Sequence, residues 1–419
     1  MNNRASAGGE KPGRLARALG PFAMADFRRL SLAGFAVFVV RWLEILAVGV
    51  FVYQHTGSAF LVALISMLRP LGMMTLGAFI GDLADRMDRR LVLLLVVATL
   101  LITSIVLGVL AHADALEVWH LIVAGIINGI VGTFDIPVRR LMLGNAVGPD
   151  RLSAAMSIDV ASHNASRMLG PLLAGIVLSR VGMDGIYGVS AILHLIALVA
   201  VIRVRQRGPV DSAPGPSVSS PLLDVIERLR DGLHLARHDP RLFGTLIVTV
   251  IYNIWAWPFI SMIPVLGHDN WNLGAEGTGY LASMDGVGAF TGAIVIAFLV
   301  RPGLYRVFYV GGAAMFMIMA IVFALVPSAA LGGAALLTLG FCGAGFSIMQ
   351  STLAFLSAPP DMRGRILGVL SVCIGIGVIG FLHLGLLADL IGARWATVLM
   401  CAEGLLAFAL TRRYWRVVE

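Results

Sequence analysis

Ionisable side chains occur inside long apolar stretches of this chain, where an unpaired charge is expensive. Arg41 and Glu44 stand three residues apart in the first such stretch, so on a helix they share one face and could pair with each other. At the centre of a membrane helix a charged side chain costs about 2.5–3.5 kcal/mol, so such residues are functional candidates. A carboxylate that alternates between a wet and a closed environment can load a proton on one side and release it on the other. Glu44 is therefore our first candidate for proton coupling.

A second polar group recurs at helical spacing further along the chain. Asp159, His163 and Arg167 are four residues apart in turn, and Asn164 lies beside them. This polar stripe is expected to face the interior of a helix bundle, because lipid would reject it. His163 has the best claim among the in-span histidines to proton work, since imidazole titrates near neutral pH.

Other charged residues in apolar stretches need partners. Asp135 and Arg139 are four residues apart and could form a structural ion pair or line a transport path. Arg69 and Asp285 have no oppositely charged neighbour in sequence, so each needs a partner from another helix. The alternative for the whole set is that these charges only hold helices together. Two further in-span histidines are expected to be hydrogen-bonded core residues, His194 and His383.

The elements that must position these residues are membrane helices. Hydrophobic residues make up 58% of the 419 residues and charged residues 13%, about half the share of roughly 25% that is typical of soluble domains. The apolar residues gather in runs of about 20, the length that crosses a bilayer. We expect an all-α membrane protein with twelve spans, at about 31–53, 58–81, 91–111, 119–141, 154–178, 185–203, 242–265, 278–300, 305–326, 331–356, 365–388 and 394–411.

The loops between these spans differ sharply in charge. Arg180 and Arg394 are the only basic residues that this assignment puts in outer loops, although the chain carries 31 Lys and Arg and a net charge of +7. The positive-inside rule therefore predicts an inner (cytoplasmic) membrane protein with both termini in the cytoplasm. A nucleic-acid partner is not expected, because a nucleic-acid-binding patch would not alternate loop by loop. The tail before the first span has no apolar region of a signal peptide, so we expect a cytosolic tail.

A polar segment divides the spans six and six. Its first part is rich in Pro and Ser, and its second part should form an amphipathic helix on the inner surface. GSAFL at 57–61 aligns with GTGYL at 277–281, which favours a parallel repeat of two six-helix bundles. The expected organisation is a tail 1–30, a bundle 31–205, a linker 206–240, a second bundle 241–411 and a tail 412–419.

The loop after the second span carries the sequence GAFIGDLADRMDRR (77–90). It resembles the signature loop of the major facilitator superfamily, G-x-x-x-D-R-x-G-R-R. Acids at a helix end and arginines in a tight loop could clamp neighbouring helix ends and release them, as a gate latch does. Anchoring of the loop in the cytosol would explain the arginines but not the acids among them. The residues of this expected latch are Gly81, Asp82, Asp85, Arg86, Arg89 and Arg90, and Asp88 stands where the motif has glycine.

Further motifs resemble the branch of this superfamily that holds the enterobactin exporter and related drug-efflux permeases. They are D-x-P-x-R on span four, N-x-x-R followed by Gly-Pro on span five, and P-x-x-x-R-G-R before span eleven. Gly170, Pro171 and Gly175 partly resemble the span-five motif of drug/proton antiporters, whose full form has more glycines. A proline kink that only serves packing is the alternative for them.

The resemblance also implies which residues meet the substrate. In the superfamily, spans one, four, seven and ten line a central cavity. Trp255 and Trp257 on span seven could stack on an aromatic substrate, although tryptophans also serve packing or the membrane interface. The residues that the resemblance places near the substrate are Arg41, Glu44, Asp135, Asn253, Trp255, Trp257 and Gln350.

These observations predict a secondary transporter rather than an enzyme. We expect a monomer among membrane lipids that exports a small hydrophobic or amphipathic molecule, a drug or siderophore-like compound, by alternating access in exchange for protons. A solute importer or lysolipid transporter of the same fold, or a non-transporting membrane sensor, are the alternatives. No ATP-binding or hydrolase motif is present in the sequence, so the proton gradient is the expected energy source and no cofactor is expected. The cysteines have no metal-ligand spacing, so no metal site is expected: Cys342, Cys373 and Cys401.

Overall fold

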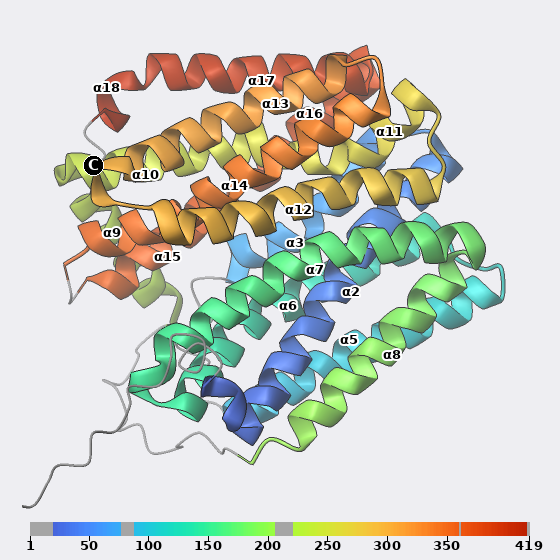
Figure 1. Ribbon diagram of the computed structural model, residues 1–419, viewed down its shortest axis with the longest axis horizontal. Helices are drawn as coiled ribbons and strands as arrows, with labels where there is room; N and C mark the ends of the chain where they lie inside the picture. Colours follow the sequence, from blue (N-terminus) through green and yellow to red (C-terminus); the bar gives the residue numbers. More distant parts are fainter. Residues whose placement is uncertain (1–19, 77–87, 206–220, 360–361, 417–419) are drawn as a thin grey trace, which may run out of the picture.

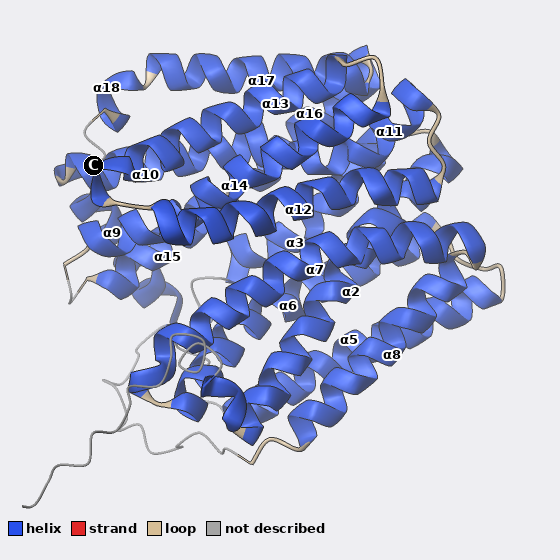
Figure 2. Ribbon diagram, in the orientation of Figure 1, coloured by secondary structure: helices blue, strands red, loops and turns tan. Residues whose placement is uncertain are grey.

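The computed structural model describes residues 20–76, 88–205, 221–359 and 362–416. Within these ranges the regular structure is entirely helical, without a strand (Figure 2). Ten of the helices described are long and apolar enough to cross a membrane. The shorter apolar stretch Ala59–Gly72 and the polar-striped helix Leu152–Arg180 complete the twelve expected spans. The predicted twelve-helix fold is therefore confirmed.

The first six membrane helices form one bundle, in the blue to green part of Figure 1. Gly57 adopts the left-handed conformation (φ 65°) and its N–H caps the first helix on the Tyr53 carbonyl, so the chain turns tightly into the second helix. The helices of this N-terminal bundle are α2 (Ala25–Thr56), α3 (Ala59–Leu76), α5 (Arg89–His112), α6 (Val118–Val147), α7 (Leu152–Arg180) and α8 (Met183–Ile202), with short 3₁₀ turns at Gly20–Ala23 and Pro149–Arg151.

The remaining helices form a second bundle, in the yellow to red part of Figure 1. Its first span is broken into four pieces, because Pro258 and Pro264 lack the backbone donors that a continuous α-helix needs. The pieces of this span are α10 (Pro240–Ile251), the π-turn η3 (Tyr252–Ala256), the 3₁₀ turn η4 (Trp257–Met262) and α11 (Ile263–Trp271). The other helices are α12 (Ala275–Leu299), the π-turn η6 (Val307–Gly311) continuing into α13 (Gly312–Leu325), α14 (Ala329–Ser357), α15 (Arg363–Gly375), α16 (Gly377–Ile391), α17 (Ala393–Leu410) and α18 (Arg412–Trp415), with a 3₁₀ turn at Pro302–Leu304.

An amphipathic helix, α9 (Pro221–His238), lies between the two bundles in sequence and packs on the second. Asp231 pairs with Arg365 of α15 at 2.9 Å, and Gly232 lets α9 approach the Arg365 backbone. The amphipathic helix expected in the linker is thus present.

Glycines set the closest helix crossings within and between the bundles. A Cβ on Gly340 of α14 would collide with the backbone carbonyl of Asp285 in α12, and one on Gly72 of α3 would collide with the backbone of Gly129 in α6. Between the bundles, Gly175 of α7 meets Gly279 of α12. Such close approaches are typical of membrane helices, which associate through small residues.

The two bundles touch more closely at one end of the molecule than at the other. We call the end that holds α9, α18 and the start of α2 the linker end, and the opposite end the loop end. In Figure 1, α7 and α12 lie side by side toward the loop end and diverge toward the linker end.

Candidate functional site

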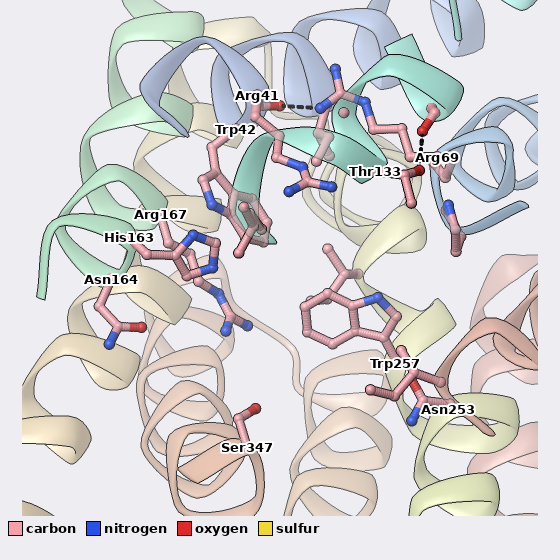
Figure 3. A pocket seen from close by; sticks show the side chains of 18 of the residues that line it. Arg41, Trp42, Arg69, Thr133, His163, Asn164, Arg167, Asn253, Trp257 and Ser347 are labelled. Carbon is pink, nitrogen blue, oxygen red and sulfur yellow. Dashed lines mark hydrogen bonds between the residues drawn. The ribbon is translucent and has the colours of Figure 1, made fainter. Parts of the chain in front are cut away.

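A cavity of about 1920 Å³ lies between the two bundles (Figure 3). Its wall comes from α2, α3, α6 and α7 on one side and from the broken first span of the second bundle and α14 on the other. It extends from Val52 of α2 to Ser153 of α7 and Arg365 of α15. This space exceeds the roughly 300–1,000 Å³ of common ligand pockets, so it can hold a drug-sized molecule.

Glu44 meets a partner from another helix. Its Oε2 accepts a hydrogen bond from Arg69 Nη2 at 2.9 Å, and both residues line the cavity. Arg69 Nη1 also lies 3.5 Å from the Arg41 carbonyl oxygen. The expectation that Arg69 needs a partner from another helix is met, whereas the possible Arg41–Glu44 pair does not form. The Arg69 guanidinium pairs with the Glu44 carboxylate, so Arg41 faces the cavity without this acid as its partner (Figure 3).

Asp135 and Arg139 belong to a buried charge cluster between α6 and α7. Arg139 Nη2 lies 3.3 Å from Asp135 Oδ2, and the same guanidinium also binds Asp159. Arg140 Nε binds the second oxygen of Asp159 at 2.8 Å. Two arginines thus balance two aspartates, as a structural ion-pair network requires.

This network withdraws Asp135 from the cavity. Its carboxylate turns toward Arg139 and does not line the wall, which corrects the expectation that it lies near the substrate. Arg139 is 1% exposed and its guanidinium lies 4.4 Å from the centre of the Phe38 ring. A Cβ on Gly34 would collide with this guanidinium, so a larger residue there would push Arg139 away from its carboxylates.

Arg167 links the two bundles. Its Nε and Nη2 bind the two carboxylate oxygens of Asp285 at 2.6 and 2.9 Å, the bidentate geometry of a strong charge-assisted pair. Among the described residues this is the one ion pair that joins α7 to α12 across the bundles. Arg167 also lies 5.2 Å from the Trp42 ring centre and 5.3 Å from that of Trp257, within cation–π range. Asp285 thereby obtains the partner that its isolated position in sequence required.

The polar stripe of α7 does not act as one chain of contacts. Asp159 binds arginines of α6, Arg167 binds Asp285 of α12, and His163 packs edge-on against Phe38 at 4.6 Å. His163 Nδ1 is buried and has no hydrogen-bond partner within the described ranges of the chain. His163 and Asn164 both line the cavity, as a stripe facing the bundle interior should.

The second bundle contributes Asn253, Trp257 and Gln350 to the wall, as expected. Asn253 Nδ2 donates to the Thr249 carbonyl at 2.9 Å, and Gln350 Nε2 to the Thr249 hydroxyl at 3.3 Å. Trp255 does not line the cavity, which corrects its expected place. Residues two apart on a helix point in nearly opposite directions, so Trp255 and Trp257 cannot share one face.

Trp255 instead contacts Glu403, an acid that the sequence analysis did not select. Its indole N–H donates to Glu403 of α17 at 3.1 Å, and the same oxygen lies 2.8 Å from His383 Nε2 of α16. The signal was available, because Glu403 is an acid within an otherwise apolar span. His194 bonds to the Ser104 hydroxyl at 3.0 Å in the core, as expected of it.

Part of the expected latch lies outside the described residues, namely Gly81, Asp82, Asp85 and Arg86. Arg89 and Arg90 begin α5, and the side chain of Asp88 caps this helix by accepting from the Arg90 backbone N–H at 2.9 Å. The guanidinium of Arg90 donates to the Ile202 carbonyl at the end of α8 at 2.6 Å. The acid that replaces the motif's glycine thus has a helix-capping role.

The expected kink residues lie at close helix contacts. α7 runs from Leu152 to Arg180 with Pro171 inside it. A Cβ on Gly170 would meet the backbone of α2 at Leu43, and Gly175 faces α12. These glycines therefore serve packing against both bundles.

The Major Facilitator Superfamily sequence model matches residues 30–382, which is most of the chain. The chain belongs to the major facilitator superfamily. Among similar proteins, the enterobactin exporter EntS of Shigella flexneri is 27% identical over 347 residues, covering 82% of this chain and 80% of the relative. The enterobactin exporter EntS of Escherichia coli O1:K1 / APEC is 28% identical over 348 residues, with the same coverage.

Solved structures show the same fold at low sequence identity. The nucleoside transporter NupG superposes with a TM-score of 0.72 at 13% identity, over 92% of this chain and 98% of that one. A bacterial homolog of the human lysosomal transporter Spinster, inward-facing and unoccupied, gives 0.71 at 14% identity, over 97% and 98%. A POT family transporter in complex with a thioalcohol-conjugated peptide gives 0.75 at 13% identity, over 94% and 96%. This superfamily member is therefore a multi-pass membrane transporter.

Contacts between the bundles close the loop end of this transporter. The Tyr53 hydroxyl of α2 donates to Asp269 of α11 at 2.7 Å. Asp389 of α16 accepts from the Phe60 backbone N–H of α3 at 3.1 Å and lies 3.4 Å from the Ser58 hydroxyl. Both acids come from the second bundle and both donor sets from the first, so these contacts hold the two bundles together at the loop end.

Proposed function

We propose that this transporter exports a small hydrophobic or amphipathic molecule, of the drug or siderophore kind, by alternating access in exchange for protons. The large cavity, its closed loop end and the likeness to enterobactin exporters support this proposal. In the described conformation the cavity is poised to load substrate from the linker end.

The same proposal places the linker end in the cytosol of a cell whose inner membrane holds the protein. Basic residues concentrate in the segments of this end, and the positive-inside rule assigns such segments to the cytosol. A cavity that loads from the linker end then takes its substrate from the cytosol, which is the first step of export.

Glu44 is the residue that we assign to proton coupling. It is the single acid among the described residues that line the cavity, and its ion pair with Arg69 links α2 to α3. A proton on Glu44 neutralises the carboxylate and releases Arg69, and loss of that proton restores the pair. Making or breaking this ion pair requires only the gain or loss of one proton on Glu44. Proton exchange can therefore be coupled to a shift of α2 relative to α3. This single acid in the wall is the observation that carries the proposal.

The test uses the purified protein in proteoliposomes with an imposed pH gradient and enterobactin as the transported probe. The wild type should accumulate enterobactin in vesicles with an acidic lumen, because protons leave as substrate enters. Glu44→Gln should lose this accumulation and retain exchange of labelled for unlabelled probe. Glu117→Gln, an exposed acid at the loop end, is the matched control and should behave as the wild type.

Two results contradict the proposal. Full gradient-driven accumulation by Glu44→Gln removes Glu44 from the coupling step. Accumulation by the wild type only with the opposite gradient indicates symport and favours the importer.

A further inference from the structure

The cavity wall is one-sided in charge. In the part of the chain that the structure describes, five arginines and one histidine line it, against the single acid Glu44. Buried charges in a membrane are tolerated when they are paired or face water, so each arginine of the wall needs an explanation.

Four of the five arginines are already neutralised by the protein. Arg69 binds Glu44, Arg140 binds Asp159, Arg167 binds Asp285 and Arg365 binds Asp231. The guanidinium of Arg41, by contrast, has no ion pair or hydrogen bond to any residue in the described ranges. Among the arginines of the described wall, Arg41 is therefore the one without a direct ion pair.

Two tryptophans share the cavity wall with this cation. Trp42 follows it on α2, and Trp257 faces the same space from the second bundle (Figure 3). Both indoles also lie within cation–π distance of Arg167, whose charge is paired with Asp285. A flat ring that enters this space meets two large aromatic side chains that come from opposite bundles.

We infer that the transported molecule is an aromatic anion, whose acidic group pairs with Arg41 while its ring packs against Trp42 and Trp257. This inference rests on the proposed function and names its substrate class. A carboxylate or a similar group can take two hydrogen bonds from a guanidinium, which is the strong form of such a pair. When the cavity closes around the anion, Arg41 is neutralised and leaves no unpaired charge in the membrane.

The two other charge classes fit the wall less well. A cation meets no free acid in the described part of the wall, because Glu44 is bound to Arg69, and it is repelled by Arg41. A neutral molecule leaves Arg41 without a counter-charge when water is excluded. The wall thus selects against cations because Arg41 repels them, and against neutral molecules because they leave the Arg41 charge unpaired.

The experiment measures binding of 2-naphthoate to the protein in lipid nanodiscs, with 2-naphthalenemethanol and 2-naphthylmethylammonium as competitors of matched size. The anion should bind at least about tenfold more tightly than the alcohol or the ammonium. Arg41→Gln should weaken the anion about tenfold and leave the alcohol within about twofold. Arg41→Lys should fall between, because an ammonium keeps the charge without the planar fork.

Two further variants separate recognition from folding. Arg301→Gln changes an exposed arginine between α12 and α13 and should bind all three probes as the wild type does. Trp257→Leu should weaken the three probes by a similar factor, because it removes ring contact and not charge. Retained binding of the alcohol by Arg41→Gln shows that this variant is folded.

Three results overturn the inference. The alcohol or the ammonium binds as tightly as the anion, or Arg41→Gln weakens all three probes equally, or none of the probes binds. The proteoliposome assay then separates the two proposals. If the wild type still accumulates enterobactin under the pH gradient, the proposed export function stands and only the aromatic-anion class is wrong. If this accumulation is also absent, both proposals are wrong.

Discussion

Tyr53→Phe deletes the hydroxyl that α2 donates to Asp269 at the loop end and leaves the aromatic ring in place. The bond is 2.7 Å long and joins the two bundles. Nothing else in the contact changes, because phenylalanine keeps the packing of the ring. A state that is open at the loop end should therefore gain population relative to the described state, in which this bond is present.

The size of the shift follows from the bond. A hydrogen bond to a charged group contributes about 1.5–3 kcal/mol, and the Asp269 side chain is 39% exposed, so water recovers part of this. We expect about 1 kcal/mol, which is about a fivefold change in the equilibrium. Asp389→Ala removes the second contact, to the Phe60 N–H at 3.1 Å, and should act independently with a similar size. The double variant should therefore shift the equilibrium by about thirtyfold.

The assay follows alkylation of a cysteine placed at Val52, which is buried and lines the cavity toward the loop end. The three native cysteines are replaced by alanine, and a membrane-impermeant maleimide is added on the loop side of right-side-out vesicles. The rate should rise by the factors given above. Tyr280→Phe is the matched control, since its hydroxyl bonds to Glu276 within α12 at 3.3 Å and joins no bundles. A Tyr53→Phe rate equal to that of Tyr280→Phe refutes the reasoning.

Three further predictions concern packing and buried charge. Gly340→Ala places a methyl group against a backbone carbonyl of α12 and should lower the free energy of unfolding by about 1–3 kcal/mol. Gly188→Ala is the control, because the space around Gly188 is open, and it should change this free energy by less than about 0.5 kcal/mol. Thermal unfolding in detergent measures both variants. Asp285→Asn leaves Arg167 as an uncompensated buried cation and should destabilise the fold by about 3–5 kcal/mol in the same assay, and a smaller loss in the double variant with Arg167→Gln would confirm the pair. Glu403→Ala leaves the Trp255 indole N–H without its acceptor and should lower the free energy of unfolding by about 1–3 kcal/mol. The affinity for 2-naphthoate should stay unchanged, because Glu403 lies outside the cavity wall. A tenfold loss of this affinity would contradict that placement.

The helices could be predicted because each depends on local composition. A run of about 20 apolar residues has one structure available to it in a bilayer, so the spans and their order follow from the sequence. The broken span between Pro240 and Trp271 shows the limit. Its apolar content predicted a helix, and its prolines decided where the helix changes to a π-turn and a 3₁₀ turn.

The partners of the buried charges could not be predicted from one sequence. Isolated Arg69 and Asp285 showed that a partner on another helix was needed, but which helix supplies it depends on packing. Spacing on one helix suggested a pair between Arg41 and Glu44, and Arg69 of α3 takes the carboxylate instead. The direction of Trp255, away from the cavity, could have been predicted from the sequence, since residues two apart on a helix cannot share the face of Trp257.

The measurement that tests the account most directly is the sidedness of the two ends, because export from the cytosol requires the linker end to face it. Single cysteines replace His238 in α9 and Ala113 after α5, both exposed, in a background without native cysteines. Intact cells are then treated with an impermeant maleimide. We predict labelling at position 113 and protection at position 238 until the cells are opened. Labelling of position 238 in intact cells would place the cavity mouth outside the cell and contradict the account.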